Sequence, residues 1–98
     1  MSEKYSNDGK TQGADVLLVA AHLRAARALL DWSAKALSER SGVSPATLQR
    51  LERSVGVPSA HPRTIGDLKR VLEDAGVEFM GTPDEPGVIL RRPKQDGR

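Results

Sequence analysis

Few side chains in this sequence could do covalent chemistry. There is no cysteine, and the two histidines, His22 and His61, stand far apart in the sequence. Disulfides and thiolate metal sites are therefore excluded, and a zinc site is not expected. Ser38, Ser41 and Ser44 fall at predicted helix caps and turns, and no plausible general base stands near them to activate a hydroxyl as a nucleophile. The pattern favours a binding protein without metal or cofactor over an enzyme.

The charged side chains could instead bind a polyanion, because they are segregated along the chain. Residues 73–85 contain acids and no base, whereas residues 22–53 have a basic excess. The bases of that stretch are Arg24, Arg27, Lys35, Arg40, Arg50 and Arg53, against the acids Asp31, Glu39 and Glu52. The acidic stretch should not face a polyanion. Solvated helix faces would give the same segregation, so charge alone does not decide the function.

Length and composition indicate one compact domain. A chain of 98 residues that is 38% hydrophobic can build one modest core. It has no apolar run long enough to cross a membrane and no signal-peptide pattern, so we expect a cytoplasmic protein. We expect a helical domain over residues 15–76, a short β segment over 77–92, and flexible polar tails at 1–14 and 93–98.

Four helices are predicted from apolar periodicity and capping residues. They span residues 16–30, 34–40, 45–53 and 63–74. Ser33 and Ser44 should cap the second and third helices, and Pro45 suits the first position of the third. Gly42 should end the second helix and turn the chain, and Gly76 should cap the fourth. The fold is therefore expected to be mainly α.

The segment after Gly76 predicts a hairpin or two short strands. Residues 77–80 alternate weakly, residues 88–90 are apolar, and a turn rich in glycine and proline separates them. A lone hairpin of this size is marginal in water, so it must pack on the helices or pair with a second chain. Residues 77–92 are thus a candidate dimerisation element.

The second and third helices are joined by a tight turn over residues 41–43, with Gly42 at the bend. Leu37, Val43, Leu48 and Leu51 supply apolar positions that can brace the two helices. This is a helix-turn-helix pattern: a major groove about 12 Å wide admits one helix, and the turn leaves one face of that helix free. Helix pairs with glycine turns also occur in repeats and bundles, so the pattern alone does not establish DNA binding.

The wider sequence is more specific. The stretches LRAARALLDWS (residues 23–33), LSERSGVS (37–44) and ATLQRLE (46–52) resemble the XRE family, the phage-repressor and Cro-like regulators. The resemblance covers roughly residues 21–79. It implies a four-helix Cro/repressor-like helix-turn-helix domain, here followed by a short C-terminal β-hairpin or strand pair, with double-stranded DNA as the partner.

The resemblance also implies that the helix 45–53 lies in the major groove. Members of the XRE family contact bases from four positions of this helix, and these positions are occupied here by Pro45, Ala46, Gln49 and Arg50. Arg50 can fork onto guanine O6 and N7, Gln49 can pair with adenine, and Ala46 can touch a thymine methyl. Pro45 offers only apolar contact.

Six residues are assigned to the DNA backbone: Ser33, Lys35, Ser44, Thr47, Arg53 and Arg63. Ser33 and Lys35 lie at the amino end of the second helix, whose free N–H groups and dipole attract anions. The resemblance sets Arg63 near the minor groove. The chain departs from the family at Ala34 and Ala36, where members often have Gln and Glu, which predicts weaker anchoring there.

Other residues are assigned to structure. Arg27 and Glu52 occupy positions where many family members form a largely buried ion pair between the first and third helices. Trp32 just precedes a helix start and is expected to fill the core. His22 and His61 are expected to face solvent.

Three functions remain open. The first is a homodimeric repressor or activator on a palindromic operator. The second is an antitoxin that also binds a toxin enzyme, through the acidic segment 73–85 or the N-terminal tail. The third is a protein-interaction adaptor that has lost DNA binding, against which Arg50, Arg53 and Arg63 argue.

Overall fold

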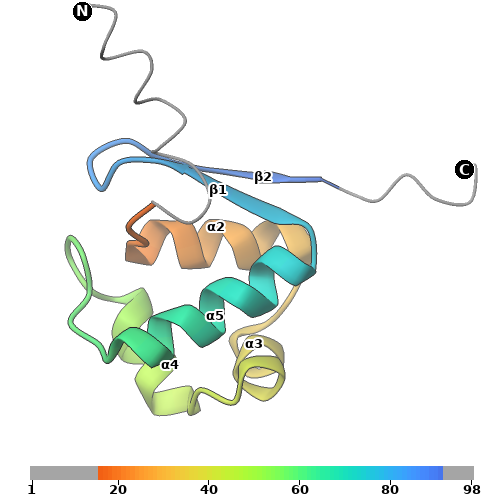
Figure 1. Ribbon diagram of the computed structural model, residues 1–98. Helices are drawn as coiled ribbons and strands as arrows, with labels where there is room; N and C mark the ends of the chain where they lie inside the picture. The colour runs from red at the N-terminus through yellow and green to blue at the C-terminus, as the bar shows by residue number, and fades with distance from the viewer. Residues whose placement is uncertain (1–15, 92–98) are drawn as a thin grey trace, which may run out of the picture.

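A computed structural model describes residues 16–91 of the chain. Its elements are, in order, α2 (Ala20–Leu30), α3 (Ala34–Ser41), α4 (Pro45–Glu52), α5 (Pro62–Asp74), β1 (Val77–Gly81) and β2 (Pro86–Leu90), as Figure 1 shows. The predicted mainly α fold, with four helices and a C-terminal strand pair, is confirmed. The predicted tails lie outside the described residues. Within residues 16–91, no helix combines the length and apolarity needed to cross a bilayer.

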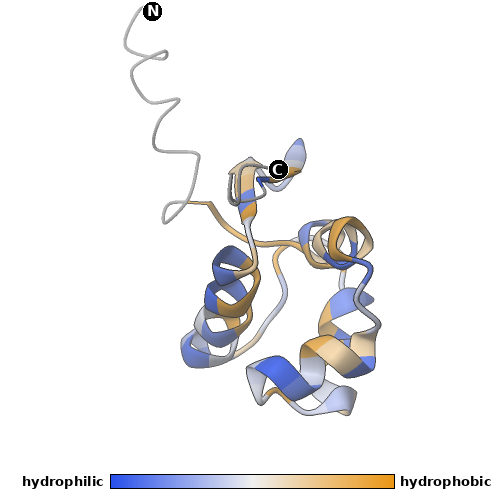
Figure 2. Cartoon of the chain, turned by 90° about the vertical axis from the view of Figure 1, so that its right-hand side faces the viewer, coloured by the Kyte–Doolittle hydropathy of each residue, from blue (hydrophilic) through white to orange (hydrophobic). Residues whose placement is uncertain are grey.

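The core lies between the four helices and the hairpin. Its largest fully buried apolar side chains are Phe79, Leu23, Leu37, Leu48, Leu51, Leu68 and Leu72. Figure 2 shows the apolar side of α5 turned toward the other helices. Trp32 is half-buried and packs against this core, with the guanidinium carbon of Arg40 4.3 Å from its ring centroid. Every element thus contributes to one core.

The short helices α3 and α4 begin at side-chain caps. The hydroxyl of Ser33 accepts a hydrogen bond from the Ala36 N–H at 3.0 Å, and that of Ser44 accepts one from the Thr47 N–H at 3.2 Å. Each cap satisfies an N–H group that has no partner within its helix. The predicted ends of the second, third and fourth helices differ from the structure by at most one residue.

The first helix begins later than predicted. It starts at Ala20, and Val19 has extended backbone angles, φ −117° and ψ 172°. Over residues 16–18 burial alternates, with Val16 5% exposed, Leu17 57% and Leu18 3%, and Val19 is then buried next to the start of the helix. Alternation is typical of extended chain, because successive side chains point to opposite sides. The prediction of a helix from residue 16 was wrong. Residues 16–21 are all apolar, and such a run has no periodicity that distinguishes a helix from an extended segment.

The prediction that His22 faces solvent was also wrong. Its side chain is 1% exposed, and its Nδ1 accepts a hydrogen bond from the Val19 N–H at 3.1 Å. Nε2 lies 3.0 Å from the Met80 carbonyl oxygen, which can only accept, so the neutral ring with its hydrogen on Nε2 satisfies both contacts. His22 therefore joins the start of α2 to β1. His61 is exposed, as expected, and caps α5 by accepting from the Arg63 N–H.

Replacing His22 by leucine should destabilise the fold by about 1–3 kcal/mol, because it leaves the Val19 N–H and the Met80 carbonyl buried without their partner. Chemical denaturation followed by circular dichroism would measure the loss. His22→Gln, which can keep one of the two hydrogen bonds, should lose less. Equal stability of the leucine variant and the wild type would contradict this role.

The hairpin is antiparallel, with Val77 opposite Leu90 and Phe79 opposite Val88. Helix α5 is capped by Ala75 instead of Gly76, and the glycine follows with φ +108°. At the other end of β1, Gly81 has φ +88°, and a Cβ there would collide with the Glu85 carbonyl oxygen. Only glycine fits this approach to the turn.

The hairpin packs on its own chain, with β2 against α2 and β1 against α5 (Figure 1). Val77 and Phe79 are buried there, so the hairpin has a core without a second chain. Figures 1 and 2 place it on the side of the molecule away from α3 and α4. The acidic segment spans several elements: residues 73–74 end α5, Glu78 lies in β1 and pairs with Arg91, and residues 84–85 lie in the turn between the strands.

Candidate nucleic-acid interface

Helices α3 and α4 form a tight two-helix unit. Gly42 ends α3 with φ +79°, a left-handed conformation that costs glycine little. The Ser38 hydroxyl then donates to the Val43 carbonyl at 2.6 Å, and the Val43 side chain is buried. Leu48 of α4 is fully buried as well. The turn is thus held by apolar contact and by a hydrogen bond, while the opposite face of α4 stays exposed.

The exposed face of α4 borders an open hollow of about 810 Å³. Nine residues of α2, α3, α4 and the residue after it line this hollow: Arg24, Arg27, Ala34, Lys35, Pro45, Ala46, Gln49, Glu52 and Arg53. Three of the four residues predicted to contact bases lie here together, with Lys35 and Arg53 from the predicted backbone set. The only acid in this lining is Glu52, which is buried and paired. The hollow is therefore basic, with small or polar side chains on α4.

Arg50, the fourth predicted base contact, lies outside this lining. It is exposed, and its Nη1 donates to the Ser59 carbonyl at 3.0 Å, in the segment between α4 and α5. Its other guanidinium donors have no hydrogen bond within residues 16–91. Because the guanidinium is planar and has five N–H donors, this contact orients it and leaves donors for another acceptor.

The remaining predicted backbone contacts are distributed over helix starts. Ser33 and Ser44 use their hydroxyl oxygens as caps, and the Ser44 hydroxyl also donates to Thr47 Oγ1 at 3.0 Å. Lys35 is 82% exposed at its side chain and lies 3.8 Å from Glu39, so its charge is available to solvent. Arg63 is exposed in the first turn of α5.

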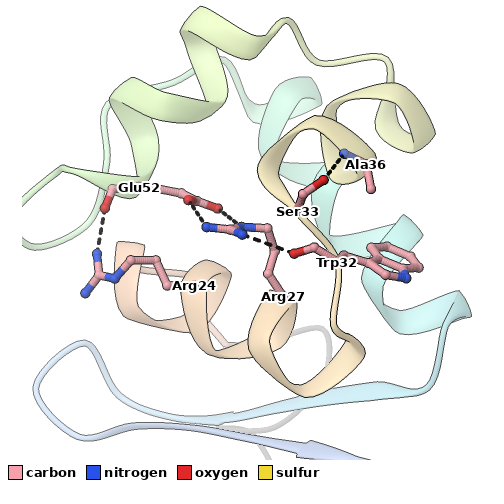
Figure 3. A network of polar contacts seen from close by, with 6 residues as sticks. All are labelled: Arg24, Arg27, Trp32, Ser33, Ala36 and Glu52. Carbon is pink, nitrogen blue, oxygen red and sulfur yellow. Dashed lines mark hydrogen bonds and ion pairs between the residues drawn. The ribbon is translucent and has the colours of Figure 1, made fainter.

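A polar network joins α2 to the end of α4 (Figure 3). Arg27 Nε and Nη2 each donate to one carboxylate oxygen of Glu52 at 2.8 Å, and Nη1 donates to the Trp32 carbonyl at 3.1 Å. The side chains are 23% and 9% exposed. Arg24 Nη1 donates to the Glu52 main-chain carbonyl at 2.6 Å. This network sets how α4 sits against α2, and hence how its exposed face is presented.

The network with Glu52 favours the protonated, positively charged form of Arg27. Its hydrogen bonds to Glu52 raise the pKa of the guanidinium, burial works in the opposite direction, and the nearby carboxylate charge adds to the rise. A raised pKa stabilises the folded state at every pH below the ordinary arginine value. The arginine side of this pair therefore adds no pH dependence near neutrality.

Arg24 was missed as a member of the site. It lies three residues before Arg27, so both point to the same side of α2. That spacing could have found it, because Arg27 was already assigned to the α4 end. Its exposed guanidinium adds a third cation to the hollow beside Lys35 and Arg53.

A capped two-helix unit with a basic exposed face defines the class of helix-turn-helix DNA-binding domains. The comparison with protein families agrees: the model described as Helix-turn-helix matches residues 23–61, which is less than half of the chain. Over residues 23–61 the chain is thus similar to the helix-turn-helix of XRE-family regulators, which confirms the resemblance seen in the sequence. A search of curated proteins found no match to the chain.

Proposed function

We propose that this protein is a sequence-specific transcriptional regulator that reads the major groove with α4. The observation that carries the proposal is the basic hollow, in which the exposed side chains of α4 are flanked by Arg24, Lys35 and Arg53. Phosphates run along both walls of a groove that receives a helix, so cations on either side of α4 suit that position.

Base readout is assigned to Pro45, Ala46, Gln49 and Arg50. Gln49 can donate to and accept from adenine, and Ala46 can pack on a thymine methyl. Arg50 suits guanine O6 and N7, and the Ser59 carbonyl pre-orients its guanidinium. The small side chains of Pro45 and Ala46 allow α4 to approach the bases closely.

Backbone contacts are assigned to three places. The amino end of α3, with Ser33 and Lys35, attracts a phosphate through its N–H groups and dipole. Ser44 and Thr47 present hydroxyls at the start of α4, and Arg53 follows its end. Arg63, at the start of α5, would reach the sugar-phosphate backbone next to the major-groove site.

We further propose that the regulator acts as a homodimer on a palindromic operator. In the hairpin, the Arg91 N–H donates to the Gly76 carbonyl. In an antiparallel ladder every second pair is hydrogen-bonded, so the Glu78–Ile89 and Met80–Gly87 pairs also direct their main-chain N–H and C=O groups toward each other. Val88 and Leu90 therefore direct theirs to the outer edge of β2, and Ile89 is 37% exposed. An edge that has no strand partner among residues 16–91 can accept a strand of a second copy. Light scattering of the purified protein, alone and with DNA, would give the oligomeric state.

The function is tested by titrating fluorescent DNA, comparing a random duplex with a pool of selected sites at several salt concentrations. Affinity should fall steeply with salt. Arg50→Ala should cost about 1–3 kcal/mol, mainly on the selected site. Arg53→Ala should weaken both DNAs similarly and reduce the salt dependence, because it removes a phosphate contact.

Arg70→Ala is a matched control, because Arg70 is exposed on α5 and pairs with Asp67 instead of lining the hollow. It should leave binding nearly unchanged. If neither DNA binds near physiological salt, where non-specific dissociation constants are about 10⁻⁴–10⁻⁶ M, the proposal fails and a protein-interaction adaptor is favoured.

A further inference from the structure

The last turn of α4 is held to α2 by a main-chain contact as well as by the ion pair. Glu52 is the last residue of α4, and its carbonyl accepts a hydrogen bond from Nη1 of Arg24 at 2.6 Å. The carbonyl groups at the end of a helix have no partner within the helix, and the helix dipole makes that end negative, so a guanidinium suits this position. In Figure 3, Arg24 reaches the main chain of Glu52 while Arg27 binds its carboxylate.

This contact differs from the others at the end of α4. The carbonyls of Arg50 and Leu51 accept hydrogen bonds from the N–H groups of the two residues that follow the helix, so these bonds stay within one segment. The Glu52 carbonyl is bound by a side chain of another helix. Because α4 has only eight residues, it is not stable without its neighbours. Arg24 therefore helps to fix where the last turn of α4 lies relative to α2.

The guanidinium of Arg24 can also bind a second acceptor. Its side chain is exposed and lines the hollow beside α4. Of the five N–H donors that a guanidinium carries in one plane, those on Nε and Nη2 make no hydrogen bond within residues 16–91. The only acid in the lining of the hollow is Glu52, and both of its carboxylate oxygens are bound to Arg27. The positive charge of Arg24 is therefore not neutralised by the lining of the hollow.

We propose that Arg24 binds a DNA phosphate and the Glu52 carbonyl with the same guanidinium, and so makes the placement of α4 depend on the DNA backbone. The inference rests on the proposed function and extends it, because Arg24 becomes a positioning residue that contacts no base itself. A planar group with donors at fixed angles has little freedom once it is bound on two sides. The phosphate thus fixes the guanidinium, and the guanidinium holds α4 where Gln49 can reach a base.

The test compares Arg24→Ala and Arg24→Lys with Lys35→Ala on selected-site and random duplex DNA. Lys35 lines the same hollow, but its ammonium group lies beside Glu39 of its own helix, so its removal matches the change of charge only. Lys35→Ala should weaken both DNAs by the same factor. Arg24→Ala should reduce the slope of log affinity against log salt by about 0.9, which corresponds to one phosphate. It should also lower the ratio of selected-site to random affinity about threefold to tenfold.

Arg24→Lys separates the two roles of the side chain. Lysine keeps the charge without the planar fork, so it should restore the salt slope while the affinity ratio stays below that of the wild type. The Arg27–Glu52 ion pair remains in every variant, so thermal unfolding should stay close to the wild type.

Two results would overturn the inference and leave the proposed function standing. One is an equal loss on both DNAs for Arg24→Ala, because Arg24 would then bind phosphate without placing α4. The other is a lower affinity ratio with an unchanged salt slope, because the contact with Glu52 would then be purely structural. If the wild type binds neither DNA, the proposed function fails as well.

Discussion

Replacing Glu52 by alanine is expected to lower the free energy of unfolding by about 3–5 kcal/mol. The substitution leaves Arg27 charged and only 23% exposed, with its Nε and Nη2 donors unpaired. It also removes the side-chain ion pair between α2 and the end of α4, while the hydrogen bond from Arg24 to the main-chain carbonyl of residue 52 can remain. Because a domain of this size is stable by only about 5–15 kcal/mol, the loss should appear as a much lower melting temperature.

Glu39→Ala is the matched control for this prediction. Glu39 also faces a cation, Lys35, but at 3.8 Å and with both side chains mostly exposed. Its removal should cost no more than about 1 kcal/mol. Urea denaturation of both variants measures the difference. Similar losses would show that the Arg27–Glu52 pair is worth no more than a surface pair.

Replacing Phe79 by alanine is expected to destabilise the whole domain by about 3–5 kcal/mol. Phe79 is fully buried, and its ring meets that of His22 edge-on, with centroids 5.6 Å apart and planes at 81°. The alanine leaves a cavity between the hairpin and α2. Since the hairpin and helices share one core, we expect a single cooperative transition at lower denaturant concentration.

Ile89→Ala serves as the control within the same hairpin, because Ile89 is 37% exposed on the other face of the sheet. It should change stability by less than about 1 kcal/mol. Far-ultraviolet and tryptophan signals of Phe79→Ala should move together. If the helices of that variant melt as in the wild type, the hairpin is an independent appendage and not part of the core.

Much of the helix-turn-helix unit could be predicted from the sequence because its causes are local. Ser33 and Ser44 cap the helices that follow them, and each contact spans three residues. Gly42 turns the chain by its own conformational freedom. Spacing on one helix likewise relates Pro45, Ala46 and Gln49, since residues three and four apart share a face.

The sequence by itself therefore determined the helices, the turn, the strand pair and the residues on the exposed side of α4. The tertiary structure alone decided the burial of His22, whose ring contacts the Met80 carbonyl 58 positions along the chain. It also decided the hydrogen bond from the Arg50 guanidinium to the Ser59 carbonyl. It also decided that Arg24, Lys35 and Arg53 border one hollow. The physical reason is reach: caps and turns depend on neighbours in sequence, whereas burial and side-chain partners depend on which elements pack together.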